Sequence, residues 1–131
     1  MRALVDCELG VVAVDLEAEE VELEDVPDRL PGPEPPQVGL PLVVAADRMG
    51  PTVVAVVDRR PPVVISSDGG LTWKEAGAGL PPGRAVAISP EHPDLILFAG
   101  ESRLFLSRDG GRFWSALAVE LPGIAGIAWD D

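Results

Sequence analysis

The chain has 131 residues, of which 47% are hydrophobic, and a formal net charge of −12. This charge repels phosphate backbones and anionic membrane surfaces, so we expect neither nucleic acid nor a membrane as a partner. No apolar run is long enough to span a membrane, and the start, Met1 to Cys7, lacks the long apolar region of a secretory signal. These features predict a single domain, residues 1–131, that resides in the cytoplasm.

The residue types of common metal and nucleophile sites are scarce. Cys7 is the only cysteine and His92 the only histidine, which argues against the usual zinc ligand sets and against a Cys-His or Ser-His pair within one chain. We therefore expect no metal and no cofactor. Arginine supplies nine of the ten basic residues, and proline and glycine number 14 each. This composition is compatible with a thermophilic source.

The segment 2–26 predicts three strands. Arg2 to Asp6 and Gly10 to Leu16 are short apolar runs. In Glu17 to Val26, Val21 and Leu23 alternate with glutamates, and a period of two favours a strand with one face in water. The acidic run is expected to be a solvated sheet edge that discourages pairing with other chains. The alternative is a binding site for cations or basic proteins.

A proline-rich connection, Pro27 to Gly39, separates these strands from the next unit. Its prolines exclude a strand or a helix interior, and we expect a stiff crossing between two units of one domain. Four strands are then predicted at Leu40–Ala46, Thr52–Val57, Val63–Ser66 and Trp73–Ala78.

The same pattern starts again after a short turn. Strands are predicted at Arg84–Ser89, Asp94–Ala99, Arg103–Ser107 and Trp114–Glu120, and a last one at Ile124–Trp129. The last run matches the first strand of each preceding unit, so the chain ends on a strand that its first unit lacks.

A motif repeats in the second and third units. Ser66-Ser67-Asp68-Gly69-Gly70-Leu71-Thr72-Trp73 returns in the third unit as Ser107-Arg108-Asp109-Gly110-Gly111-Arg112-Phe113-Trp114. Asp-Gly-Gly after an apolar run predicts a hairpin turn, because glycine adopts positive φ freely and the aspartate can accept hydrogen bonds from backbone N–H groups. The tryptophan is expected to pack beneath the turn. A catalytic carboxylate or a metal ligand is the alternative role for Asp68 and Asp109.

The two octapeptides resemble the Asp-box, Ser-x-Asp-x-Gly-x-Thr-Trp, of sialidase-like, sortilin-like and photosystem-assembly β-propellers. The resemblance covers residues 40–131, and residues 1–39 only by strand order. It implies an all-β fold of four-stranded antiparallel blades in which the box is structural and lies far from any active site. The residues with this structural role are Ser66, Asp68, Gly70, Thr72, Trp73, Ser107, Asp109, Gly111 and Trp114.

Strand counting then predicts three blades per chain. Blades two and three cover residues 40–78 and 84–120, and the strands of residues 2–26 need the strand at 124–129 to complete the first blade. Propellers close with four to eight blades. We therefore expect a C₂ homodimer that forms one six-bladed ring, in which the last strand of each chain completes the first blade of the other. The alternatives are a monomeric three-bladed stack and a fragment of a larger ring.

Candidate site residues gather where the innermost strands end. Propeller geometry places Asp47, Arg48, His92, Trp129 and Asp130 at one mouth of the channel, where Trp129 either stacks on a ligand or plugs the channel. The chain has no tyrosine for sialidase chemistry. Glycosidase chemistry needs two carboxylates about 5 to 10 Å apart, and the candidates are Asp47, Glu91, Asp94, Asp130 and Asp131.

Two functions remain at this stage. The first is a non-catalytic binding or assembly scaffold that presents propeller loops and a central channel to a protein partner. The second is a carbohydrate-binding or glycosidase-like protein that uses the channel mouth. Fold resemblance alone cannot choose between them. We expect the first, because the candidate carboxylates are no more than any acidic protein offers.

Overall fold

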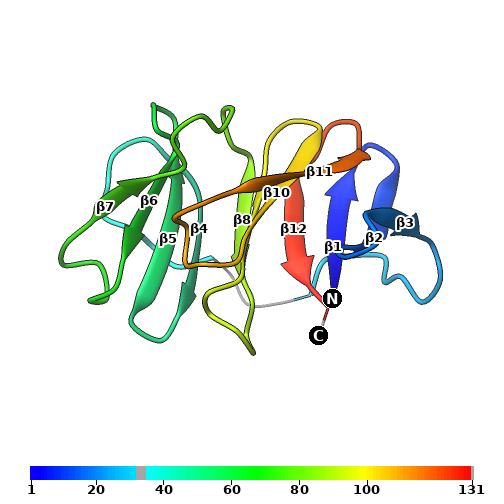
Figure 1. Ribbon diagram of the computed structural model, residues 1–131, viewed down its shortest axis with the longest axis horizontal. Coiled ribbons are helices and arrows are strands. Elements are labelled where there is room, and N and C mark those ends of the chain that lie inside the picture. Colours follow the sequence, from blue (N-terminus) through cyan, green and yellow to red (C-terminus); the bar gives the residue numbers. More distant parts are fainter. Residues whose placement is uncertain (32–34, 131) are drawn as a thin grey trace.

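The computed structural model describes residues 1–31 and 35–130, and within them the chain forms twelve strands in three four-stranded antiparallel sheets. The all-β prediction is confirmed. Residues 32–34 of the proline-rich connection and the candidate carboxylate Asp131 lie outside the described residues. Figure 1 shows the sheets side by side, with the first and the last strand next to each other.

Each sheet has its own order of strands. Sheet 1 has the order β12-β1-β2-β3, with β1 (Arg2–Cys7), β2 (Gly10–Asp15), β3 (Glu20–Glu22) and β12 (Gly126–Trp129). Sheet 2 consists of β4 (Val43–Met49), β5 (Thr52–Val57), β6 (Val63–Ser66) and β7 (Lys74–Ala76). Sheet 3 consists of β8 (Ala85–Ile88), β9 (Ile96–Ala99), β10 (Arg103–Ser107) and β11 (Ser115–Glu120).

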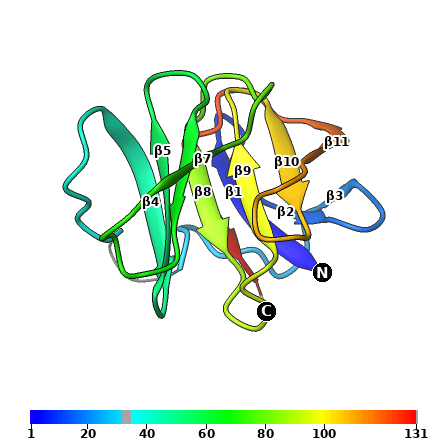
Figure 2. The same ribbon diagram turned by 60° about the vertical axis from the view of Figure 1, so that its left-hand side comes forward.

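Sheet 3 lies between the other two. Its first strand, β8, contacts both β4 of sheet 2 and β12 of sheet 1, so the innermost strands of the three sheets are neighbours (Figures 1 and 2). Strands β5, β9 and β1 pair with these strands, and the short or irregular strands β7, β11 and β3 form the opposite edges. Three sheets that stack by their faces are consistent with propeller blades.

Apolar residues at alternate positions form a core at each of the two interfaces. Between sheets 2 and 3, the buried side chains are Val54, Val56, Val63, Val86, Ile88, Ile96 and Phe98. Between sheets 3 and 1, the buried set is larger and includes Ala3, Val5, Val12, Val14, Leu97, Leu104, Leu106, Ile127 and Trp129. Because successive residues of a strand point to opposite faces, sheet 3 contributes one set of side chains to each interface.

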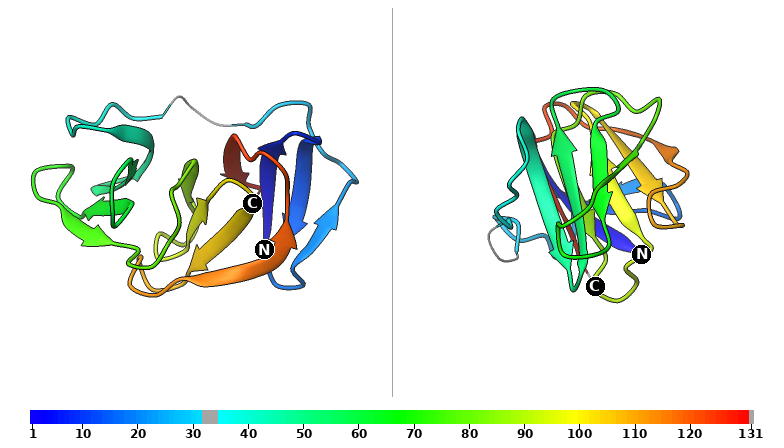
Figure 3. Two further views of the ribbon diagram at one scale, coloured as in Figure 1. Left: turned by 90° about the horizontal axis from the view of Figure 1, so that it is seen from above. Right: turned by 90° about the vertical axis from the view of Figure 1, so that its left-hand side faces the viewer.

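The last strand completes sheet 1 of its own chain. Residues Ala3 to Asp6 of β1 pair with Trp129 to Gly126 of β12 in antiparallel register. The exchange of this strand between two chains stays a prediction. Residues 23–42, here called the strap, connect β3 of sheet 1, at one end of the stack, to β4 of sheet 2, at the other end (Figure 3).

Two predicted strands differ clearly from the observed ones. The predicted strand Glu17–Val26 contains only β3, because residues 16–19 form the turn after β2 and the strap begins at residue 23. The strand predicted at Leu40–Ala46 is instead Val43–Met49, so Asp47 and Arg48 belong to this strand and do not follow it. Leu40 lies in the strap and packs on sheet 2.

Candidate functional site

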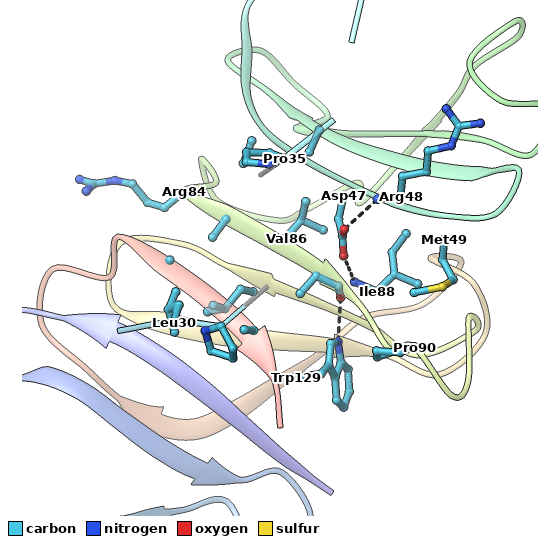
Figure 4. A pocket seen from close by; sticks show the side chains of 18 of the residues that line it. Leu30, Pro35, Asp47, Arg48, Met49, Arg84, Val86, Ile88, Pro90 and Trp129 are labelled. Atoms are coloured by element: carbon cyan, nitrogen blue, oxygen red, sulfur yellow. Dashed lines mark hydrogen bonds between the residues drawn. The ribbon is translucent and has the colours of Figure 1, made fainter. Parts of the chain in front are cut away.

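A groove runs along the innermost strands of all three sheets. It has a volume of about 810 Å³ and is lined by β4, β8 and β12 together with Leu30, Pro31 and Pro35 of the strap (Figure 4). Alanine occurs six times among the lining residues, at positions 45, 46, 85, 87, 125 and 128. Such small side chains let a ligand approach the strand backbones closely.

Asp47 joins sheets 2 and 3 at the floor of this groove. Its Oδ2 accepts a hydrogen bond of 2.7 Å from the backbone N–H of Ile88 on β8, and its Oδ1 accepts one of 2.8 Å from the N–H of Arg48. Figure 4 shows the carboxylate between the two strands. Both oxygens therefore have backbone donors, and the side chain acts as a link between neighbouring innermost strands.

Trp129 forms the corresponding link from the other side. Its indole N–H donates a 3.0 Å hydrogen bond to the carbonyl of Ala87 on β8, and the residue is 8% exposed (Figure 4). Strand β8 is therefore tied by side chains to β4 and to β12. The burial of the ring leaves little of its face free to stack on a ligand.

The other three predicted mouth residues have different surroundings. Asp130 forms a 2.8 Å ion pair with Arg2, at the edge of the groove. Arg48 also lines the groove, but its Nε–H donates to the carbonyl of Gly50 at 2.9 Å, so the side chain folds over its own turn. His92 is exposed in the turn between β8 and β9 and does not line the groove.

The candidate carboxylates are not all together. Asp47 and Asp130 line the groove, whereas Glu91 and Asp94 lie in the exposed turn that also holds His92. In that turn the carbonyl of Asp94 accepts a 3.0 Å hydrogen bond from the N–H of Gly110. This contact joins the turn to the second box, residues 107–114, which corresponds to the first box, residues 66–73. The Asp94 backbone therefore has a structural role.

The strap forms a wall of the groove that the sequence pattern did not predict. Leu30 lies so close to β12 that a Cβ on Gly126 would be 2.8 Å from the Leu30 Cδ1. A signal was available in the lengths of the connections. The strap spans residues 23–42, whereas the connections that enter β8 and β12 span only residues 77–84 and 121–125.

The box turns lie between the third and fourth strands of sheets 2 and 3. The carboxylate of Asp68 accepts hydrogen bonds from the N–H groups of Leu71 and Thr72 at 3.1 and 2.9 Å, and from the hydroxyls of Thr72 and Ser66. These donors, first of all the Thr72 hydroxyl, hold the pKa of Asp68 well below its ordinary value of 3.8. Asp68 therefore serves as an ionised acceptor inside its turn.

The second box is built in the same way. Asp109 accepts hydrogen bonds from the N–H groups of Arg112 and Phe113 at 3.1 and 3.0 Å and from the hydroxyl of Ser107 at 2.9 Å. The N–H of Phe113 is the main cause of a lowered pKa of Asp109. In each box the serine hydroxyl also accepts the N–H of the second glycine at 2.8 Å.

The described residues offer neither a metal cluster nor a membrane helix. Across residues 1–31 and 35–130, no three His, Cys, Asp or Glu side chains come close enough together to hold a metal ion. That part of the chain also has no helix with the length and hydrophobicity needed to cross a bilayer. Neither a protein-family model nor a curated protein matches the sequence.

Proposed function

We propose that this chain is a non-catalytic binding or assembly scaffold made of Asp-box β-propeller blades, and that it presents the groove along β4, β8 and β12 to a protein partner. The observation that carries the proposal is the use of the groove's polar side chains. Asp47 and Trp129 are bonded to the backbone of β8, and Asp130 is paired with Arg2. These groups hold the strands in place, and what remains for a ligand is a largely apolar floor with the exposed Arg84 beside it.

The groove has the size and the chemistry of a peptide site. Its volume of about 810 Å³ lies within the range of roughly 300 to 1,000 Å³ that is usual for ligand sites. The strap already places an apolar leucine and prolines against this floor. A partner segment of similar apolar, extended character is the ligand that this surface would accept.

The carbohydrate alternative depends on an accessible aromatic ring. Trp129 is 8% exposed and its N–H is already bonded, which argues against sugar stacking as its role. A glycan array with the native chain tests this alternative directly. A sugar that binds the chain and competes with the protein partner would favour the carbohydrate-binding function over the scaffold function.

We further propose that two chains form a six-bladed ring, since three sheets side by side make only part of a closed propeller. Light scattering coupled to gel filtration, over a concentration series that reaches the millimolar range, measures this. A mass that rises from 13.8 kDa to twice that value supports the ring. A mass that stays at one chain throughout contradicts it.

The scaffold proposal is tested by capturing partners from the source cells with tagged chains, followed by quantitative mass spectrometry. Arg84→Glu and Ala125→Glu change exposed residues that line the groove, and Leu71→Glu changes an exposed residue of the first box as the matched control. A partner that is at least tenfold depleted by both groove variants and retained by the control supports the groove. A partner lost only with the control would move the site to the box turns.

A further inference from the structure

The stack has two end faces, one on sheet 2 and one on sheet 1. The outer face of sheet 2, which points away from sheet 3, carries Ala46, Ala55 and Val64 in one row across β4, β5 and β6. The matching row of sheet 3 is Val86, Phe98 and Phe105. In sheet 3 this row packs against the whole face of sheet 2.

The outer face of sheet 2 has no sheet of the described chain against it. Its cluster of Ala46, Ala55, Val57 and Val64 is packed by Trp73 of the same sheet and by two residues of the strap, Val38 and Leu40. The strap therefore covers this face with only two aliphatic side chains. The equivalent face of sheet 3 is covered by an entire sheet, namely sheet 2.

The first part of the strap lies against the outer face of sheet 1, where a Cβ on Gly126 of β12 would be 2.8 Å from the Leu30 Cδ1. That face carries Leu4 and Ala13, which pair across β1 and β2 and are 1% and 0% exposed. Arg2 holds the strap there, because its Nη2 donates to the carbonyls of Glu24 and Asp25 at 2.9 and 3.1 Å. One connection thus covers both ends of the stack.

The length of the strap matches this crossing and exceeds what a neighbour needs. Adjacent sheets are joined by short connections, residues 77–84 and 121–125, whereas the strap spans residues 23–42. When fully extended, the strap reaches at most about 70 Å and the connection 77–84 about 28 Å. With stacked sheets about 10 Å apart, a connection from sheet 1 to sheet 2 spans about 20 Å before it covers either face. A reach of about 28 Å leaves little length for such a cover, whereas the strap has enough length for both faces.

The strap ends in a strained and exposed segment. Leu42 has a φ of +62°, which a bulky residue adopts at a cost of about 1–2 kcal/mol. Its side chain is 60% exposed, and those of Val43 and Val44 that follow are 36% and 48% exposed. Three consecutive apolar side chains thus remain uncovered beside the outer face of sheet 2.

The two end faces differ in charge. The strands of sheet 1 place Arg2 and four carboxylates on its outer face, namely Asp6, Asp15, Glu20 and Glu22. On the outer face of sheet 2, Arg48 of β4 is balanced by Glu75, which pairs with Val64. An acidic face repels its own copy, so the end of one stack is better matched to the unlike end of another. A ring closed by two stacks brings together these unlike ends.

We propose that the two end faces are mating surfaces for a second copy of this chain, and that the strap is their intramolecular cover. The inference rests on the proposed six-bladed ring and names its interfaces. In the dimer, sheet 1 of the ring takes β1, β2 and β3 from one chain and β12 from the other. The strap then needs to reach only the adjacent sheet and leaves both faces free. Within one chain, the tethered β12 has an effective concentration of order millimolar, which favours the closed monomer in dilute solution.

The test shortens the strap. Deletion of residues 28–39 leaves only residues 23–27 and 40–42 between β3 and β4, as many as enter β8. The expected result is a folded dimer at all micromolar concentrations, with native near-ultraviolet circular dichroism, because the shortened strap joins adjacent sheets readily and has no residues left to cover the end faces. A folded monomer of this variant overturns the proposal.

A second variant keeps the full strap and removes only its apolar cover. Val38→Asp with Leu40→Asp is expected to lower the concentration at which half of the chains are dimeric by at least tenfold relative to the native chain. Leu71→Asp, on the exposed first box, is the control and should leave that concentration unchanged. A double variant that stays as monomeric as the native chain overturns the proposal, even where the deletion variant aggregates.

The two proposals fail in different ways. A native chain that never doubles its mass, beside a deletion variant that is a folded dimer, contradicts the native ring and leaves the mating faces supported. Loss of partner binding by Arg84→Glu tests neither the ring nor the mating faces, because Arg84 lies in the groove and outside both end faces.

Discussion

The two box turns have nearly the same internal hydrogen bonds and very different neighbours. In each, the tryptophan N–H donates to the carbonyl of the second glycine, at 3.1 Å in the first box and 3.0 Å in the second. Trp114 packs into the core between sheets 2 and 3, with its ring 6.0 Å from that of Phe98. Trp73 packs on the outer face of sheet 2 against a small cluster. The motif thus determines the turn, and its place in the stack determines how much the turn stabilises the fold.

Sheet 1 shows what happens without the motif. Its turn between β2 and β3 is shorter, since Asp15 pairs with Glu20, whereas Ile65 pairs with Lys74 in sheet 2. Asp15 still accepts the N–H groups of Glu17 and Ala18, at 2.9 and 3.0 Å. The N–H of Ala18 is the main cause of its lowered pKa. A single aspartate can therefore order a turn, but this turn carries no tryptophan to bury.

The largest expected effect separates the two tryptophans. Trp114→Ala should lower the free energy of unfolding by about 3–4 kcal/mol, because it empties part of a core closed on both sides. Trp73→Ala should cost about half as much, since its ring has a sheet on one side only. Urea unfolding followed by circular dichroism measures both. Equal losses would contradict the difference in packing between the two turns.

The second glycine of each box offers a sharper version of the comparison. Gly111 and Gly70 have φ values of +95° and +100°, so alanine is strained at both. A Cβ on Gly111 would be 2.3 Å from the Ile65 Cδ1 of the neighbouring sheet, whereas on Gly70 its nearest contact is Trp73 at 3.5 Å. The Ile65 Cδ1 is the end of a half-buried side chain that can rotate away, so Gly111→Ala should cost about 1 kcal/mol more than Gly70→Ala.

A compensating change tests the cause of that difference. Ile65→Val removes the Cδ1 that a new Cβ would meet. Combined with Gly111→Ala, it should cost less than the sum of the two single changes. Strict additivity in the unfolding free energies would show that strain of the backbone, and not the contact between sheets, explains the cost.

The acid stability of the two boxes should differ as well. Hydrogen bonds lower the pKa of Asp68 below 3.8, so its contribution to stability is present above the unfolded pKa and is lost as the pH falls through the folded pKa. Asp68→Asn should therefore reduce the difference in melting temperature between pH 6 and pH 3. Asp109→Asn should reduce it less, because Asp109 has no hydroxyl partner equivalent to Thr72. Thermal scans at both pH values decide, and equal reductions would contradict the ranking.

The repeat made much of the fold predictable from the sequence. Three strands, Thr52–Val57, Val63–Ser66 and Arg103–Ser107, have the predicted bounds, because each is an apolar run between strong turn signals. Leu40 and Asp47 show where prediction of strand bounds from the sequence fails, since Leu40 lies in the strap and Asp47 in β4. An apolar leucine suits a strand as well as a strap that packs on a sheet, and only the stack decides which it joins.

The groove was less predictable than the sheets. The sequence predicted that Asp47 and Trp129 lie at the innermost strands. It did not predict the hydrogen bonds by which these two side chains hold β8. Those bonds depend on how far apart neighbouring sheets lie, which no local pattern contains. The route of the strap was hidden for the same reason, since its length allows the last strand to pair within its own chain or with another.

The smallest expected effect is a gain. Phe113 occupies the box position of Thr72, whose hydroxyl donates to Asp68, and its ring is 79% exposed. Phe113→Thr should therefore supply Asp109 with the missing donor at little loss of buried area, and raise the melting temperature at pH 7 by roughly 1–3 °C. Phe113→Val is the matched control, since it keeps the branched shape without the hydroxyl. If valine raises the melting temperature as much as threonine, the gain comes from removing an exposed ring, and the hydroxyl does not account for the difference between the two boxes.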